Sequence, residues 1–357
     1  MKTNLNPPNI IFLMNDHQVH YLHNGEQYGP EIKRPNFHQL KKEGISFERA
    51  YTICPLCGPA RRSILTGVYP HKHGEFINDV REKFTHETYL EALKQAGYET
   101  YYYGKWHAGP GTAKDHGCKG FSLKDYGNPY DTEEYQRYLI DRELPEIRVK
   151  IKKNMMRWPI SWLCRYKEGR TITPNYLAHS GWAIGEISTP KETHEAFFLA
   201  HQACETLRKI SEREDPKPFH LRVDFWGPHQ PFFATKEFLN LYNPSDFPEH
   251  PSFRENLNNK PKIFKKWQIL AKRGFVAPNP APWPEWQEII RYHYAQISLI
   301  DQAAGMILDT LKELGLEKNT LVCWTNDHGA LIGEHGGQFE KDGILSEELV
   351  RIPLIMR

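Results

Sequence analysis

Short apolar runs that alternate with helical patterns limit this chain to a few fold classes. Four runs are rich in apolar and aromatic residues, as strands covered on both faces are: 9–14, 98–103, 219–226 and 320–325. Between them, apolar residues recur at helical spacing, most clearly before Gly315. A last strand is expected at residues 349–356. This alternation predicts a three-layer α/β/α sandwich around a large, mostly parallel or mixed sheet.

Composition and charge exclude several classes of protein. The 357 residues are 39% hydrophobic and 25% charged, which allows a sizeable core and excludes wholesale disorder. A net charge of +2 argues against a dedicated nucleic-acid partner. The apolar run at residues 10–14 is too short to cross a membrane or to act as an export signal, so we expect a cytoplasmic protein. Its six cysteines are then expected to be free thiols.

Polar clusters follow the four apolar runs. They are Asp16 and His17 after the first, Lys105 and His107 after the second, His229 after the third, and Asp327 and His328 after the fourth. Because the carboxyl ends of parallel strands share one crevice, we expect these side chains to lie together. Two carboxylates suit Ca²⁺ or Mg²⁺, and an imidazole makes Mn²⁺ acceptable. Taken alone, the sequence 327–329 fits a simple turn after a strand equally well.

Residues 57–67, CGPARRSILTG, predict a helix that begins at Cys57 and ends before Gly67. Free backbone amides and the helix dipole favour an anion at such an N-terminus, so a thiolate would be favoured at Cys57. Arg61 lies four residues on and can reach back over the same face. The CxxC spacing of Cys54 and Cys57 is by itself weak evidence for a zinc or redox site.

Residues 122–190 show poor periodicity, and we expect an irregular insertion there. Its part from 147 to 173 is basic and contains Trp158 and Trp162. Cations and aromatic rings of this kind could bind an anionic saccharide, although a solvated charged loop explains the composition equally well.

The helix start at Cys57 resembles a known motif. Residues 57–61 (CGPAR) with 65–67 (LTG) resemble the C-x-P-x-R…TG motif of the type I, formylglycine-dependent sulfatases of the alkaline-phosphatase-like superfamily. Further segments resemble that family in the same order: 69–74 (YPHKHG), 104–107 (GKWH), 228–232 (PHQPF) and 327–336 (DHGALIGEHG). The resemblance implies one catalytic domain over residues 1–357. It is weakest between 122 and 190, and the family's C-terminal subdomain is expected to be absent.

The resemblance also implies an activity, a sulfuric ester hydrolase. A separate maturation enzyme would oxidise Cys57 to formylglycine, whose hydrate attacks the sulfur of a sulfated carbohydrate or another alkyl or aryl sulfate. One divalent metal, with Ca²⁺ preferred over Mn²⁺ or Mg²⁺, would be held by Asp16, Cys57, Asp327 and His328. The other roles implied are Arg61 orienting formylglycine, Lys105 and Lys341 binding sulfate oxygens, His229 protonating the leaving oxygen, and His107 assisting release of sulfate.

Departures from the family pattern keep some assignments open. Many members have two adjacent aspartates after the first strand, whereas here Asp16 is followed by His17. His17 therefore either binds the metal or contacts substrate, and Asn78 is a second substrate candidate. Two alternative functions also remain: a phosphonate monoester or phosphodiester hydrolase of the same superfamily, and a non-catalytic glycan-binding relative in which Cys57 is unmodified.

Overall fold

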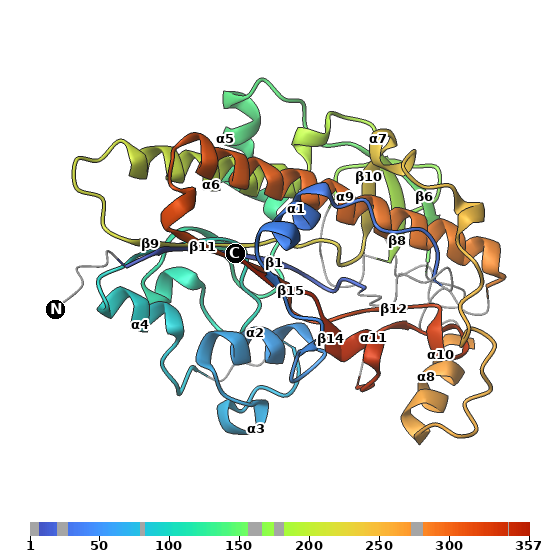
Figure 1. The fold of residues 1–357 in the computed structure, drawn as a ribbon. Coiled ribbons are helices and arrows are strands. Elements are labelled where there is room, and N and C mark those ends of the chain that lie inside the picture. The colour runs from blue at the N-terminus through green and yellow to red at the C-terminus, as the bar shows by residue number, and fades with distance from the viewer. Residues whose placement is uncertain are drawn as a thin grey trace.

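A seven-stranded mixed sheet forms the middle layer of the computed structural model (Figure 1). The structure describes residues 7–19, 28–78, 83–155, 166–174, 182–272, 281–341 and 343–357. The strand order is β2-β15-β11-β1-β9-β4-β5. Strands β11, β1, β9, β4 and β5 run parallel, and β15 is antiparallel to β11 and to β2. The bounds are β1 Asn9–Asn15, β2 Ile45–Ser46, β4 Glu99–Lys105, β5 Lys119–Leu123, β9 Phe219–Asp224, β11 Thr320–Asn326 and β15 Leu354–Met356.

Helices cover both faces of this sheet (Figure 1), which confirms the predicted three-layer sandwich. On one face lie α1 (Pro35–Glu43), α6 (Glu195–Ser211) and α9 (Trp283–Glu313), and on the other α2 (Cys57–Thr66), α3 (Pro70–His73) and α4 (Tyr89–Gln95). The main core joins the sheet to α6 and α9 through fully buried residues such as Leu13, Leu221, Leu199 and Ile300. No helix in the described ranges is long and apolar enough to span a bilayer.

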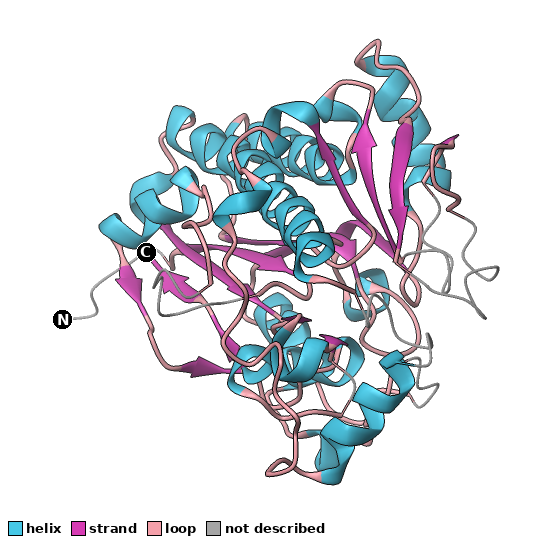
Figure 2. Ribbon diagram, turned by 90° about the vertical axis from the view of Figure 1, so that its right-hand side faces the viewer, coloured by secondary structure: helices cyan, strands magenta, loops and turns pink. Residues whose placement is uncertain are grey.

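A second, four-stranded sheet corrects the expectation of an irregular insertion at 122–190. Its order is β10-β8-β6-β7, and Figures 1 and 2 show it apart from the main sheet. Three of its strands come from the insertion: β6 (Val149–Asn154), β7 (Thr171–Ile172) and β8 (Ala183–Ile187). The fourth strand is β10 (Phe232–Thr235). The insertion also contains helix α5 (Glu133–Asp141). In β6, buried Val149 and Ile151 alternate with exposed Lys150 and Lys152, which is the two-residue alternation of a strand with one buried face. The many lysines made this segment resemble a basic loop in the sequence.

The tryptophans that suggested saccharide binding in this region, Trp158 and Trp162, lie outside the described residues. That interpretation therefore stays a prediction.

The predicted last strand at 349–356 is divided in the structure. The chain forms α11 (Glu347–Val350), then β14 (Arg351–Ile352), then β15. Strand β14 pairs with β3 (Ala50–Tyr51), whereas β15 joins the main sheet. Pro353 separates them because proline has no N–H to donate to a continuous ladder.

The structure describes several shorter elements besides these. They are α7 Lys236–Leu239, α8 Lys262–Lys272, β12 Leu331–Ile332, α10 Glu334–Gly337, β13 Phe339–Glu340, and the 3₁₀ turns Ala113–His116, Pro129–Asp131, Lys191–Thr193, Pro244–Asp246 and Glu317–Asn319.

Gly104 lets strand β4 approach β9 beside the carboxyl end of the sheet. A β-carbon at Gly104 would lie 2.0 Å from the Asp224 carbonyl oxygen, and its φ of +112° is disfavoured for other residues. We expect Gly104→Ala to lower the free energy of unfolding by about 3–5 kcal/mol, from strain and overpacking together. Gly97→Ala is the matched control, because φ is +93° but nothing lies within 4 Å; it should cost only about 1–2 kcal/mol. Urea denaturation measures both, and equal losses would contradict the close-approach argument.

Candidate active site

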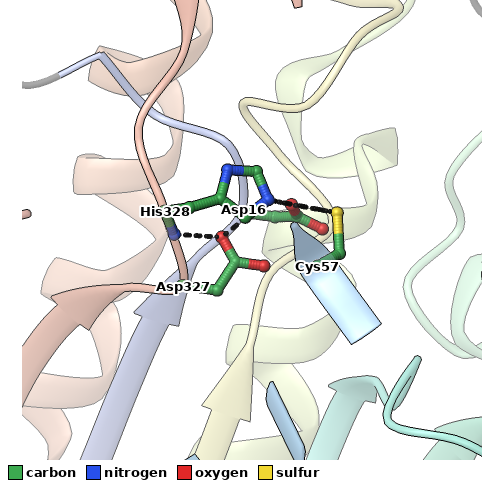
Figure 3. A group of neighbouring side chains, drawn as sticks. All are labelled: Asp16, Cys57, Asp327 and His328. Carbon is green, nitrogen blue, oxygen red and sulfur yellow. Dashed lines mark hydrogen bonds and ion pairs between the residues drawn. The ribbon is translucent and has the colours of Figure 1, made fainter. Parts of the chain in front are cut away.

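Four side chains from three segments meet at the carboxyl edge of the main sheet (Figure 3). Asp16 follows β1, Asp327 and His328 follow β11, and Cys57 is the first residue of α2. Cys57 Sγ lies 3.2 Å from His328 Nε2 and 3.6 Å from Asp16 Oδ1. One ligand atom from each residue lies within 4.8 Å of all the others, and all four residues are buried. The predicted metal ligands are therefore close enough to share one ion.

The donor set of this group fits a divalent cation. Asp16 and Asp327 supply hard carboxylate oxygens, which suit Ca²⁺, and the imidazole of His328 is a ligand that Mn²⁺ also accepts. His328 Nδ1 lies 2.8 Å from the carbonyl oxygen of Gly329, so Nδ1–H donates there and Nε2 presents its lone pair toward Cys57. Burial lowers the pKa of His328, which keeps the ring neutral and able to bind a metal.

The start of α2 holds Cys57 in place. Leu56 before it is extended, and the helix then runs to Gly67, which closes it in the left-handed conformation. The backbone N–H of Gly58 donates to Asn78 Oδ1 at 2.8 Å. Asn78 thus satisfies one of the free amides at the helix N-terminus. Its contact with substrate stays a prediction.

Arg61 joins the carboxylates around the candidate metal centre. Its Nε donates to Asp327 Oδ2 at 2.9 Å, and its Nη1 donates to the Lys105 carbonyl at 2.9 Å and to Asp224 Oδ2 at 3.0 Å. Its Nη2 lies 3.4 Å from Asp16 Oδ2. Burial alone would lower the pKa of Arg61, but these carboxylates outweigh burial and raise it. The guanidinium is therefore a permanent counter-charge for the site.

Asp224, the last residue of β9, is a site residue that sequence reasoning missed. Besides Arg61, it accepts two hydrogen bonds from Arg222, at 2.7 and 2.8 Å, and one from the Tyr102 hydroxyl at 2.7 Å. All four residues are buried. An Arg and an Asp two residues apart within a buried strand were the available signal, because buried charges occur in pairs.

Lys105 and Tyr126 form the next part of the site. The Lys105 ammonium makes an ion pair with Asp16 and lies 4.0 Å from the centroid of the Tyr126 ring. Burial alone would raise the pKa of Asp16, but Lys105 leads the charges that hold it well below the usual range. Tyr126, also missed from the sequence, lies with its ring centroid 5.8 Å from that of His107 and 5.1 Å from that of His229. The ring thus brings both predicted histidines to the same place.

Lys341 lies between the remaining predicted residues. Its Nζ is 3.2 Å from His229 Nε2, 3.3 Å from Glu340 Oε2 and 3.5 Å from His17 Nδ1. Burial, followed by the Lys341 charge, lowers the pKa of both histidines. The ring centroid of His17 lies 5.0 Å from that of His328. Lys341 and the residues around it (His17, His229 and Glu340) therefore lie directly beside the candidate metal centre.

Comparison with known proteins identifies the family of this chain. Residues 8–357 match the model of the family described as Sulfatase. The chain is 28% identical to a choline-sulfatase of Rhizobium meliloti and 25% identical to an N-acetylglucosamine-6-O-sulfatase of Bacteroides thetaiotaomicron, in both cases over 98% of its own length and 62% of the relative's. A solved structure of a phosphonate monoester hydrolase of Agrobacterium radiobacter has the same fold, with a TM-score of 0.70 and 19% sequence identity. The match covers 98% of this chain and 68% of the hydrolase chain.

These matches cover nearly the whole of this chain, whereas the chain spans only about three fifths of the two curated relatives (62% each). The family model covers all described elements from β1 to β15, including every residue of the site. The chain therefore belongs to the sulfatase family and shares its alkaline-phosphatase-like fold.

Proposed function

We propose that this chain hydrolyses sulfuric esters, with a formylglycine made from Cys57 and one divalent cation, preferably Ca²⁺. The observation that carries the proposal is the position of Cys57. Its sulfur lies at the N-terminus of α2, against buried Asp16, Asp327 and His328, with ligand atoms within 4.8 Å of one another. A structural cysteine needs none of these neighbours, whereas a nucleophile at a metal centre needs all of them.

Formylglycine as its hydrate and the divalent ion would together supply an activated oxygen nucleophile at this position. The chain's own residues do the rest. Arg61 fixes the carboxylates of Asp16 and Asp327 through its Nε and Nη2 atoms. Lys105 and Lys341 supply two ammonium groups to bind sulfate oxygens and to stabilise the charge that develops on them.

The proton for the leaving oxygen is assigned to the His229 and Lys341 pair. His229 Nδ1 lies 2.9 Å from the Gln230 carbonyl oxygen, so Nδ1–H donates there and Nε2 faces the Lys341 ammonium at 3.2 Å. A proton can therefore be held on either atom of this pair and passed to the leaving alcohol. His107, on the other side of Tyr126, is proposed to assist the later release of sulfate.

A sulfated saccharide or another small alkyl or aryl sulfate is the proposed substrate class. Support comes from the names of the curated relatives, which include a choline-sulfatase and an N-acetylglucosamine-6-O-sulfatase. A solved structure with a TM-score of 0.61 and 21% identity to this chain is a complex with its substrate, D-glucosamine-2-N,6-O-disulfate. A maturation enzyme that produces formylglycine is the protein partner that the proposal requires.

Two measurements on protein produced with a formylglycine-generating enzyme test this proposal. Mass spectrometry of the peptide with Cys57 should show the mass of an aldehyde in place of the thiol. Aryl sulfate turnover should exceed that of aryl phosphonates and phosphodiesters, and EDTA should abolish it until Ca²⁺ is restored. A dominant phosphonate rate would instead identify a phosphonate hydrolase. An unmodified thiol, no turnover and measurable saccharide binding would identify a glycan-binding protein.

A further inference from the structure

A second group of metal-ligating side chains lies beside the candidate metal centre. His17, His229 and Glu340 each offer one ligand atom, and these atoms lie within 4.8 Å of one another. None of the three belongs to the first donor set, although the backbone N–H of His17 donates to Asp327 Oδ1 at 3.0 Å. Two imidazoles and one carboxylate suit Zn²⁺, Mn²⁺ or Fe²⁺ better than Ca²⁺.

Both imidazoles are oriented as metal-ligating histidines usually are. His17 Nδ1 lies 3.2 Å from the side-chain oxygen of Gln230, and His229 Nδ1 lies 2.9 Å from the main-chain oxygen of the same residue. Carbonyl oxygens only accept hydrogen bonds, so Nδ1 of His229 carries the proton. His17 Nδ1 is also 3.5 Å from the Lys341 ammonium, but its contact with Gln230 is shorter, so we assign the proton to Nδ1 here too. Each Nε2 therefore presents a lone pair, with its ring held by a carbonyl behind it.

A cation already contacts two of the three ligands. The ammonium of Lys341 lies 3.2 Å from His229 Nε2 and 3.3 Å from Glu340 Oε2. The third ligand atom, His17 Nε2, is buried and has no hydrogen-bond partner in the described part of the chain. It lies 3.9 Å from Glu340 Oε2. One ion with bonds of about 2.0–2.2 Å could bridge that separation.

We propose that His17, His229 and Glu340 form a second cation site, suited to a transition-metal ion such as Zn²⁺, which the ammonium of Lys341 fills. The lysine gives the carboxylate of Glu340 a counter-charge but leaves His17 Nε2 without a hydrogen-bond partner among the described residues. Removal of the ammonium leaves a buried carboxylate and two oriented lone pairs around the vacated position. A buried carboxylate without a counter-charge destabilises the folded protein, and a divalent ion bound there would supply that counter-charge.

Counting bound zinc in Lys341 variants tests this proposal without reference to turnover. Wild type, Lys341→Ala and Lys341→Ala/His17→Ala are dialysed against the same buffered Zn²⁺, and zinc per chain is measured by mass spectrometry of the metal. We expect Lys341→Ala to bind one more zinc ion per chain than wild type, and the double variant to lose that ion again. Gln230→Ala in the Lys341→Ala background should weaken the added ion by about 10–100-fold, because it releases the ring of His17.

Folding of each variant is checked by circular dichroism, and Lys341→Met, which keeps the length of the side chain, replaces Lys341→Ala if the latter does not fold. A folded variant with no more zinc than wild type overturns the proposal, and so does an added ion that persists without His17. Neither result affects the proposed sulfatase activity, because the count compares variants that share the first metal centre and needs no formylglycine. Loss of turnover in Lys341→Ala together with an added zinc ion supports both proposals.

Discussion

Cys57→Ala is expected to reduce sulfate ester turnover by about 10⁴-fold or more, because alanine has no thiol-bearing carbon that the maturation enzyme can oxidise to the aldehyde, so no nucleophile forms. The metal ligands Asp16, Asp327 and His328 stay in place, so the variant should still be stabilised by added Ca²⁺ in thermal unfolding. Turnover is measured with an aryl sulfate at saturating concentration, on protein made with the maturation enzyme. Loss of turnover with retained metal binding separates a missing nucleophile from a damaged site.

Cys54→Ala is the matched control for this experiment. Cys54 lies three residues before Cys57, is half-buried, and its burial raises the pKa of its thiol. Its carbonyl oxygen accepts from Leu56 N–H, a contact that alanine keeps. We expect Cys54→Ala to change turnover by no more than about twofold. Turnover by Cys57→Ala above about one hundredth of the wild-type rate would contradict the assignment of the nucleophile.

The strand-end residues of the site could be predicted because their signal is local. An apolar run that ends in Asp16, or one that ends in Asp327 and His328, can be seen in a few residues of sequence. Parallel pairing of β1 with β11 then brings these ends together, with Asn15 opposite Asn326. The place of Cys57 at the N-terminus of a helix was likewise visible in residues 57–67. Each prediction needed only one element and the rule that parallel strands end at one edge.

The parts that sequence reasoning missed depend on contacts between distant segments. Tyr126 lies in the segment expected to be irregular, and only folding brings its ring to Lys105 and His107. Asp224 ends a buried strand that also contains His220 and Arg222, and its role in the site appears only when Arg61 reaches it from another layer. Strand β6 escaped notice because a two-residue alternation of lysine and aliphatic residues also resembles a basic loop.

Arg61→Ala is expected to be the most destabilising substitution in the site. Arg61 is buried and compensates three carboxylates, those of Asp16, Asp224 and Asp327. Removal of one partner from a buried ion network costs about 3–5 kcal/mol, because the remaining charges stay out of water. We expect a loss of this size in the metal-free protein, measured by urea denaturation in the presence of EDTA.

Calcium should reduce this loss, because an ion at the candidate metal centre neutralises two of the same carboxylates, Asp16 and Asp327. The difference in stability between wild type and Arg61→Ala is therefore expected to be smaller in saturating Ca²⁺ than in EDTA. Guanidinium and metal ion act on one pair of groups, so their effects on stability cannot be independent.

Arg62→Ala is the control that tests this coupling. Arg62 is the next residue of α2 and is also buried, but its Nη1 pairs with Glu75 at 3.2 Å and its Nη2 donates to the Lys83 carbonyl at 2.6 Å, away from the four metal ligands. Its substitution should also destabilise the protein, yet by the same amount with and without Ca²⁺. Equal losses for Arg61→Ala in Ca²⁺ and EDTA would show that no ion binds at Asp16 and Asp327. A calcium-dependent loss in Arg62→Ala would show that the ion acts through the helix as a whole.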